Sequence, residues 1–172
     1  MIVINPTSDQ VLFANEFLKI DSMAHRGKFD GDKHQQLFGL IAQVIVMDYL
    51  KLDRPKNEGF DGGFDLELNK KRYDVKCEMR TVNFQGTFVH NLSAFQINYK
   101  ADGYIFVSYN KSNGEYSICG VISKEDLKNK SVFYKKGDPR QRRDGTVMFA
   151  QCDYYELQNK YLIPLEKFIN IK

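Results

Sequence analysis

Residues 65–76 (DLELNKKRYDVK) alternate apolar and charged side chains on both sides of a short polar run, NKK. Successive side chains of a strand point to opposite faces, so this period of two predicts two strands rather than a helix. Before the polar run, Leu66 and Leu68 share one face, together with Phe64. After it, Asp74 and Lys76 share a face, and the intervening residues are apolar. The segment predicts a β-hairpin with one carboxylate-rich face.

Two amphipathic segments precede the hairpin. Residues 9–20 carry apolar side chains near helical spacing, and residues 33–50 carry them around most of the helix circumference. Asp30 or Asp32 would cap the second helix, and its apolar character favours burial against a sheet. A loop with a proline and three glycines then leads into the hairpin.

The pattern after the hairpin predicts further strands and short helices. We expect a helix over residues 91–100, strands over 103–109 and 116–123, a helical turn over 124–129, and strands over 146–151 and 154–157. Helix, hairpin, helix and strand in this order predict an α/β (α+β) fold, with a mixed sheet flanked by helices.

Chain-level properties limit the class of protein. With 172 residues and 42% apolar content, the chain is long enough for one packed domain, and we take residues 1–172 as that domain. No stretch reaches the roughly 18 apolar residues that would span a bilayer, and no secretory leader is visible, so we expect a cytoplasmic protein with no membrane partner. The three cysteines, Cys77, Cys119 and Cys152, form no CxxC pair and are interpreted as reduced thiols.

The charged face of the predicted hairpin carries the residues that point to chemistry. A tight turn near Asn69 and Lys70 would set Asp65 opposite Asp74, with Lys76 on the same face. Two carboxylates side by side are unfavourable unless a cation lies between them, and carboxylate oxygens with water are what Mg²⁺ prefers. Lys76 would orient or deprotonate an attacking water, which together with the metal suits phosphodiester hydrolysis.

Residues 59–80 (GFDGGFDLELNKKRYDVKCEMR) resemble the active-site hairpin of the PD-(D/E)xK nuclease superfamily. The resemblance covers about residues 33–110 and implies a restriction-endonuclease-like fold. It implies that Asp65 is the first metal-binding aspartate, with Asp61 as the other candidate. Asp74 and Lys76 would be the acid and the lysine of the second half of the motif, and the backbone carbonyl of Val75 would face the metal.

The helix over residues 33–50 resembles the helix that precedes this motif in the family. A glutamate often faces the active site there, whereas this chain has Gln43. The departure removes one charge from the expected site. It bears on the number of metals bound and on activity.

A basic run, residues 135–143 (KKGDPRQRR), is the candidate DNA contact. It carries Lys135, Lys136, Arg140, Arg142 and Arg143 against one acid, a local charge of +4 that exceeds the +3 of the whole chain. We expect these residues to bind backbone phosphates. The alternative interpretation is a solvated loop.

The leading hypothesis from sequence is a Mg²⁺-dependent DNA endonuclease of the restriction, phage DNA-processing or repair type, with Mn²⁺ able to substitute. Asp65, Asp74, Lys76 and Gln43 would form the catalytic set. A homodimer is left open, because cutting one or both strands depends on oligomeric state. Two alternatives are a catalytically inactive DNA-binding protein of the same fold and a glycosidase-like carboxylate pair.

Overall fold

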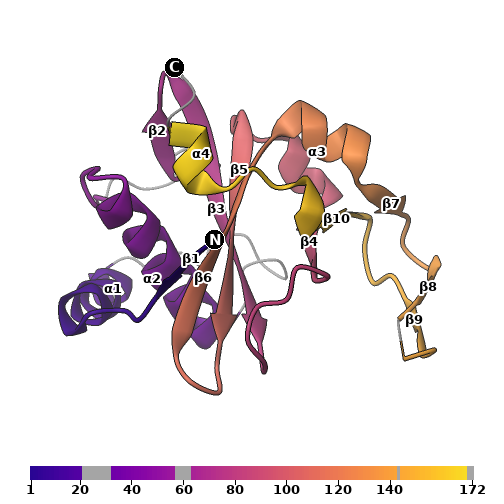
Figure 1. Ribbon diagram of the computed structural model, residues 1–172, viewed down its shortest axis with the longest axis horizontal. Helices are drawn as coiled ribbons and strands as arrows, with labels where there is room; N and C mark the ends of the chain where they lie inside the picture. Colours follow the sequence, from indigo (N-terminus) through magenta and orange to yellow (C-terminus); the bar gives the residue numbers. More distant parts are fainter. Residues whose placement is uncertain (21–31, 57–62, 143, 170–172) are drawn as a thin grey trace.

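A mixed five-stranded sheet in the order β1-β6-β5-β3-β2 forms the centre of the structure (Figure 1). This computed structural model describes residues 1–20, 32–56, 63–142 and 144–169. Strand β3 runs parallel to β5, and the other neighbouring pairs are antiparallel. The strands are β1 (Ile2–Ile4), β2 (Leu66–Leu68), β3 (Lys71–Arg80), β5 (Gly103–Asn110) and β6 (Glu115–Ser123).

Two helices, α1 (Ser8–Ile20) and α2 (Lys33–Tyr49), lie against one face of this sheet (Figure 1). A capping box starts α2: the Asp32 carboxylate accepts from the Gln35 backbone N–H at 2.8 Å, and the Gln35 side chain accepts from the Asp32 N–H at 3.0 Å. Every residue of α2 from Leu40 to Met47 is buried. The helix is therefore held by tertiary packing on nearly all sides.

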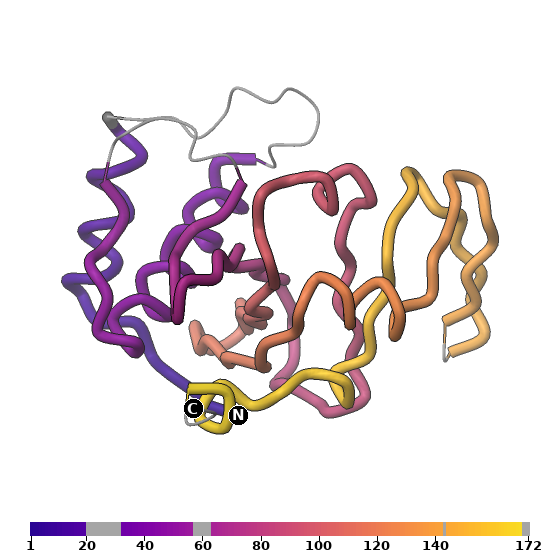
Figure 2. The backbone as a smooth tube through the Cα atoms, turned by 90° about the horizontal axis from the view of Figure 1, so that it is seen from above, coloured from indigo at the N-terminus to yellow at the C-terminus, as the bar shows by residue number. Residues whose placement is uncertain are grey.

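A second layer covers the other face of the sheet. It contains a three-stranded sheet in the order β4-β10-β7, and a two-stranded arm, β8–β9, extends beyond it (Figures 1 and 2). The strands are β4 (Val89–Ser93), β7 (Val132–Tyr134), β8 (Pro139–Gln141), β9 (Val147–Phe149) and β10 (Tyr154–Gln158). In the described ranges, the remaining helices are α3 (Lys124–Lys130), α4 (Leu165–Ile169) and two 3-10 helices, Ala94–Asn98 and Asn159–Tyr161.

The central sheet separates two apolar cores because its side chains alternate between its faces. Tyr73 and Val75 of β3 join the core beneath α1 and α2. Tyr104 and Phe106 of β5 join the core beneath the second layer. The parallel register pairs Asp74 with Tyr104, so the charged face of β3 lies toward the second layer.

The structure confirms the mixed α/β class, the helices over residues 9–20 and 33–50, and the hairpin. It also confirms the strands at 103–109, 116–123 and 154–157. The predicted helix over residues 91–100 is wrong. Residues 89–93 form β4, which pairs with β10, and the helical part is a 3-10 turn over Ala94–Asn98. Pairing with a strand about 60 residues away overrides the local helical pattern there.

None of the helices in the described ranges is long and apolar enough to cross a bilayer.

Candidate functional site

The β2–β3 hairpin brings Asp65 and Asp74 to neighbouring positions. The turn is formed by Asn69 and Lys70, with φ of +54° and +62°, the conformation of a two-residue hairpin turn. The regular register ends at the pair of Leu66 and Tyr73, and Asp65, which was expected opposite Asp74, lies just beyond it. The Asp65 N–H donates to the Tyr73 carbonyl at 2.8 Å.

The Asp65 side chain extends the pairing where the β2 ladder ends. Its Oδ2 accepts from the Val75 backbone N–H at 2.6 Å. The N–H and C=O of one residue in an extended strand point to the same edge, so the Val75 carbonyl also points toward the β2 side. A carboxylate and a backbone carbonyl thus lie at one edge of β3.

Asp74 forms an ion pair with Lys76 on the same face of β3. The Asp74 Oδ2 to Lys76 Nζ distance is 2.7 Å. The Asp74 side chain is 8% exposed and the Lys76 side chain 23%, so the carboxylate is buried while the ammonium keeps a route to solvent. Burial, with a smaller contribution from the charge of Asp74, raises the pKa of the neighbouring Tyr104.

The face that carries Asp74 has a regular charge pattern. Arg72, Asp74, Lys76, Glu78 and Arg80 alternate in sign along β3, and all five side chains leave the same face. Glu78 is one-fifth exposed and pairs with Arg80, because β4 covers this end of the strand. The alternation of charge was visible in the sequence, but the layer that covers it was not.

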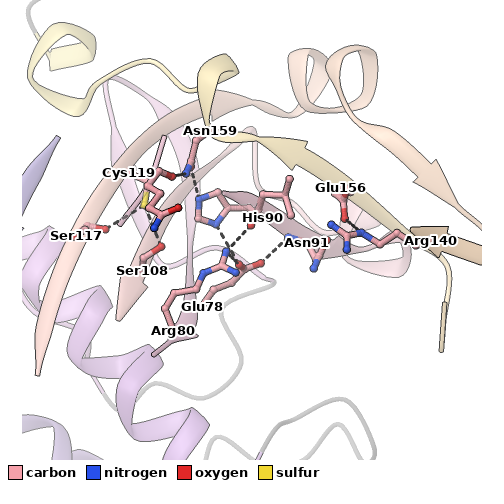
Figure 3. A network of polar contacts seen from close by, with 12 residues as sticks. Glu78, Arg80, His90, Asn91, Ser108, Ser117, Cys119, Arg140, Glu156 and Asn159 are labelled. Carbon is pink, nitrogen blue, oxygen red and sulfur yellow. Dashed lines mark hydrogen bonds and ion pairs between the residues drawn. The ribbon is translucent and has the colours of Figure 1, made fainter. Parts of the chain in front are cut away.

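Glu78 and Arg80 belong to a buried polar network that joins the two layers (Figure 3). Glu78 Oε1 accepts from the Asn91 N–H of β4 at 2.6 Å. His90 is fully buried, its Nε2 lies 2.7 Å from Asn159 Oδ1, and its Nδ1 lies 3.6 Å from Glu78 Oε2. Burial raises the pKa of Glu78 and lowers that of His90 to about 4. With no exposed surface, His90 serves to join the layers.

Gln43 lies on α2 and is 6% exposed. Helix α2 packs on the face of the sheet that carries Tyr73 and Val75, whereas Asp74 and Lys76 leave the other face. Within the ranges that the structure describes, no hydrogen bond joins Gln43 to either carboxylate. The expected convergence of Gln43 with the hairpin residues is thus not seen in the described contacts. Asp61, the alternative first ligand, lies outside the described residues.

The basic run divides between the second layer and the β8–β9 arm (Figure 1). Arg140 pairs with Glu156 of β10 and is only partly exposed, so it is engaged in holding the arm to the layer. Lys135, Lys136 and Arg142 are exposed. Arg143 lies outside the described residues. The arm also exposes the apolar side chains of Val147, Met148 and Phe149.

The donors at the hairpin partly fit a divalent ion. Asp65, Asp74 and the Val75 carbonyl supply oxygen ligands of the kind that Mg²⁺ takes, with water completing the shell. Among the described residues no group of three or more His, Cys, Asp or Glu side chains lies close enough together to hold a metal. Asp65, Asp74 and the Val75 carbonyl are oxygen donors, which suit Mg²⁺ better than they suit zinc.

Comparison with known proteins gives no relative. No family model, no curated protein and no solved structure matches the chain.

Proposed function

We propose that this protein is a metal-dependent nuclease that hydrolyses DNA phosphodiester bonds at the β2–β3 hairpin. The observation that carries the proposal is the pair of contacts that Asp65 and Lys76 make with the adjacent β3 residues Val75 and Asp74. Asp65 is tied to the Val75 N–H at 2.6 Å, and Lys76 lies 2.7 Å from Asp74. In the central sheet, β3 of the hairpin pairs in parallel with β5. This pairing suits a restriction-endonuclease-like fold, and we propose that fold as well.

Each residue has a distinct role in the proposed reaction. Asp65, Asp74 and the Val75 carbonyl would hold Mg²⁺ or Mn²⁺, which polarises the scissile phosphate when bound. Lys76 has three N–H donors, of which the Asp74 carboxylate uses one. The others are available to orient an attacking water and to stabilise charge on the phosphoryl oxygens. Lys135, Lys136 and Arg142 on the exposed part of the basic run would bind backbone phosphates.

The test is nicking of supercoiled plasmid DNA with Mg²⁺ or Mn²⁺. Asp74→Asn and Lys76→Gln keep the side-chain size and remove the charge, and each should lower the rate by at least about 100-fold, as expected for loss of a metal ligand or of a group that stabilises the transition state. Asp53→Asn, an exposed carboxylate on another loop, is the matched control and should cleave as the wild type does. Wild-type cleavage rates in both hairpin variants would place the active site elsewhere.

A second candidate is a DNA-binding protein of the same arrangement that does not cleave. Two observations favour it: α2 carries the amide Gln43 where an acid is expected, and the Asp74 carboxylate is neutralised by Lys76. Salt-sensitive DNA binding without cleavage under either metal would support this candidate.

A further inference from the structure

A depression in the surface lies beside the hairpin, toward its turn. Its lining comes from the β2–β3 turn, the start of β5 and the start of α3. Five of the lining side chains are basic and three are acidic. We call this surface the basic basin. It is lined by Glu67, Lys70, Lys71, Arg72, Ala101, Asp102, Ser123, Lys124, Glu125 and Lys128.

Backbone and side-chain contacts hold two of these cations in place. Asp102 Oδ2 accepts from the Arg72 backbone N–H at 2.9 Å and lies 3.3 Å from Arg72 Nε. The Lys124 backbone N–H donates to the Asp102 carbonyl at 2.9 Å, and Lys124 Nζ donates to the Tyr99 carbonyl at 2.7 Å. Arg72 and Lys124 are therefore both held by residues of the segment 99–102, at the junction of β3, β5 and α3.

Positive charge in the basic basin is only partly compensated. Burial, followed by repulsion from Lys128, lowers the pKa of Lys124, and Arg72 acts in the same direction. Asp102 opposes this effect. Arg72 and Asp102 are 38% and 41% exposed in their side chains, so a ligand can reach them from solvent. An anion bound there would relieve the repulsion among the cations.

The basin continues the face of the candidate active site. Glu67 pairs with Arg72 across the hairpin, and Arg72 lies two residues from Asp74 along β3. Residues two apart on a strand lie about 7 Å apart and share a face. The step from Asp74 to the first basic side chain of the basin is thus a single repeat of the strand.

We propose that the basic basin binds phosphates of the nucleic-acid strand next to the phosphate positioned at Asp65 and Asp74. The inference rests on the proposed function and adds a binding track to it. The ligand chemistry is the phosphodiester backbone, so the basin has no sequence preference of its own. The basic basin is separate from the basic run on residues 135–143. Unlike that run, it includes residues of the hairpin itself.

The test measures binding of fluorescent single-stranded and duplex oligonucleotides in EDTA, where metal-dependent cleavage is absent. Lys71 and Lys128 are exposed, so Lys71→Gln/Lys128→Gln removes two basin charges without disturbing the Lys124 contact to Tyr99. Affinity should fall about 10-fold or more. The negative slope of log K against log[salt] should become less steep by about 1.4 for single strands and about 1.8 for duplex. The matched control is Lys111→Gln/Lys130→Gln, which removes two exposed charges outside the basin and should bind as the wild type does.

Three outcomes separate this inference from the proposed function. Unchanged affinity and salt slope in the basin variant would overturn the basin, even if Asp74→Asn abolishes cleavage. Basin-dependent binding by a wild type that cleaves nothing would support the basin and overturn the nuclease. The basin could instead bind only free phosphate. In that case millimolar inorganic phosphate would displace the oligonucleotide, and affinity would not increase from a single nucleotide to a 12-mer. This result would also overturn the proposed binding track.

Discussion

Lys76 Nζ lies 2.7 Å from Asp74 Oδ2, and the carboxylate of this pair is far more buried than the ammonium. Removing the cation would leave a buried carboxylate without compensation, whereas removing both charges would not. The interaction of Asp74 with Lys76 can therefore be tested through the free energy of unfolding, without an activity assay.

Lys76→Met should lower the free energy of unfolding by about 1 to 3 kcal/mol, a range between those of exposed and buried pairs because Lys76 keeps access to water. The double variant Asp74→Asn/Lys76→Met should recover at least half of that loss. Urea denaturation at pH 7 of the wild type, both single variants and the double variant gives the coupling energy. Strictly additive effects would show that the two charges do not interact in solution.

Metal binding at Asp65 and Asp74 should stabilise the folded protein. A ligand present at 100 times its Kd raises the free energy of unfolding by about 2.7 kcal/mol, so Mg²⁺ or Mn²⁺ should raise the Tm of the wild type. Asp65→Asn and Asp74→Asn should abolish this increase, since an amide is a weaker ligand for a hard cation. Scanning calorimetry with and without metal measures these changes in Tm, and NaCl of equal ionic strength is the control. An equal increase in all three proteins would place the metal elsewhere.

Gly63 determines how the chain enters the hairpin two residues before Asp65. Its φ is +87°, and an added Cβ would lie 2.6 Å from the Tyr99 side chain. Gly63→Ala should therefore destabilise the protein by more than about 1 kcal/mol. Gly39→Ala in α2 is the matched control. A Cβ there meets no atom of the described residues within 4 Å, and the free energy of unfolding should rise by about 0.5 to 1 kcal/mol. Thermal unfolding of both variants should give a lower Tm for Gly63→Ala and a higher Tm for Gly39→Ala. Equal Tm shifts in the two variants would contradict this prediction.

His90 should make the protein less stable in mild acid. The unfolded chain binds a proton near the ordinary histidine pKa of 6.5, whereas the folded protein binds it only near pH 4. The unfolded state holds more protons between these values, so stability is complete above pH 6.5 and falls as pH decreases toward 4. The loss attributable to His90 between pH 7 and pH 5 is about 2 kcal/mol.

The variant His90→Phe keeps a ring against Phe106, from which the His90 ring lies 4.6 Å, and removes the titrating group. It should lose about 1 to 3 kcal/mol at pH 7, because Asn159 Oδ1 loses its partner, yet show a flatter stability profile from pH 7 to 5. Glu78 acts in the opposite direction, since its raised pKa makes stability fall as pH rises above 4.5. The difference between wild type and variant isolates His90. Equal slopes in urea denaturation across this pH range would refute its role.

The sequence alone determined the parts of the site that are local in the chain. The alternation in residues 65–76 and the polar run at Asn69 and Lys70 predicted the hairpin and its turn. These features follow from strand periodicity and turn geometry, which involve residues within about ten positions of each other. The buried helix α2 was predictable for the same reason, because its apolar side chains surround it.

Only the tertiary structure decided what covers the charged face of β3. Residues 91–93 of β4 were predicted as part of a helix. The pairing of β4 with β10 across about 60 residues instead covers Glu78 and Arg80, which become part of a buried network. The basic basin likewise combines the hairpin turn with α3, which follows about 50 residues later. Burial and the grouping of distant cations depend on which surfaces meet after folding, and a local pattern of residues does not contain that information.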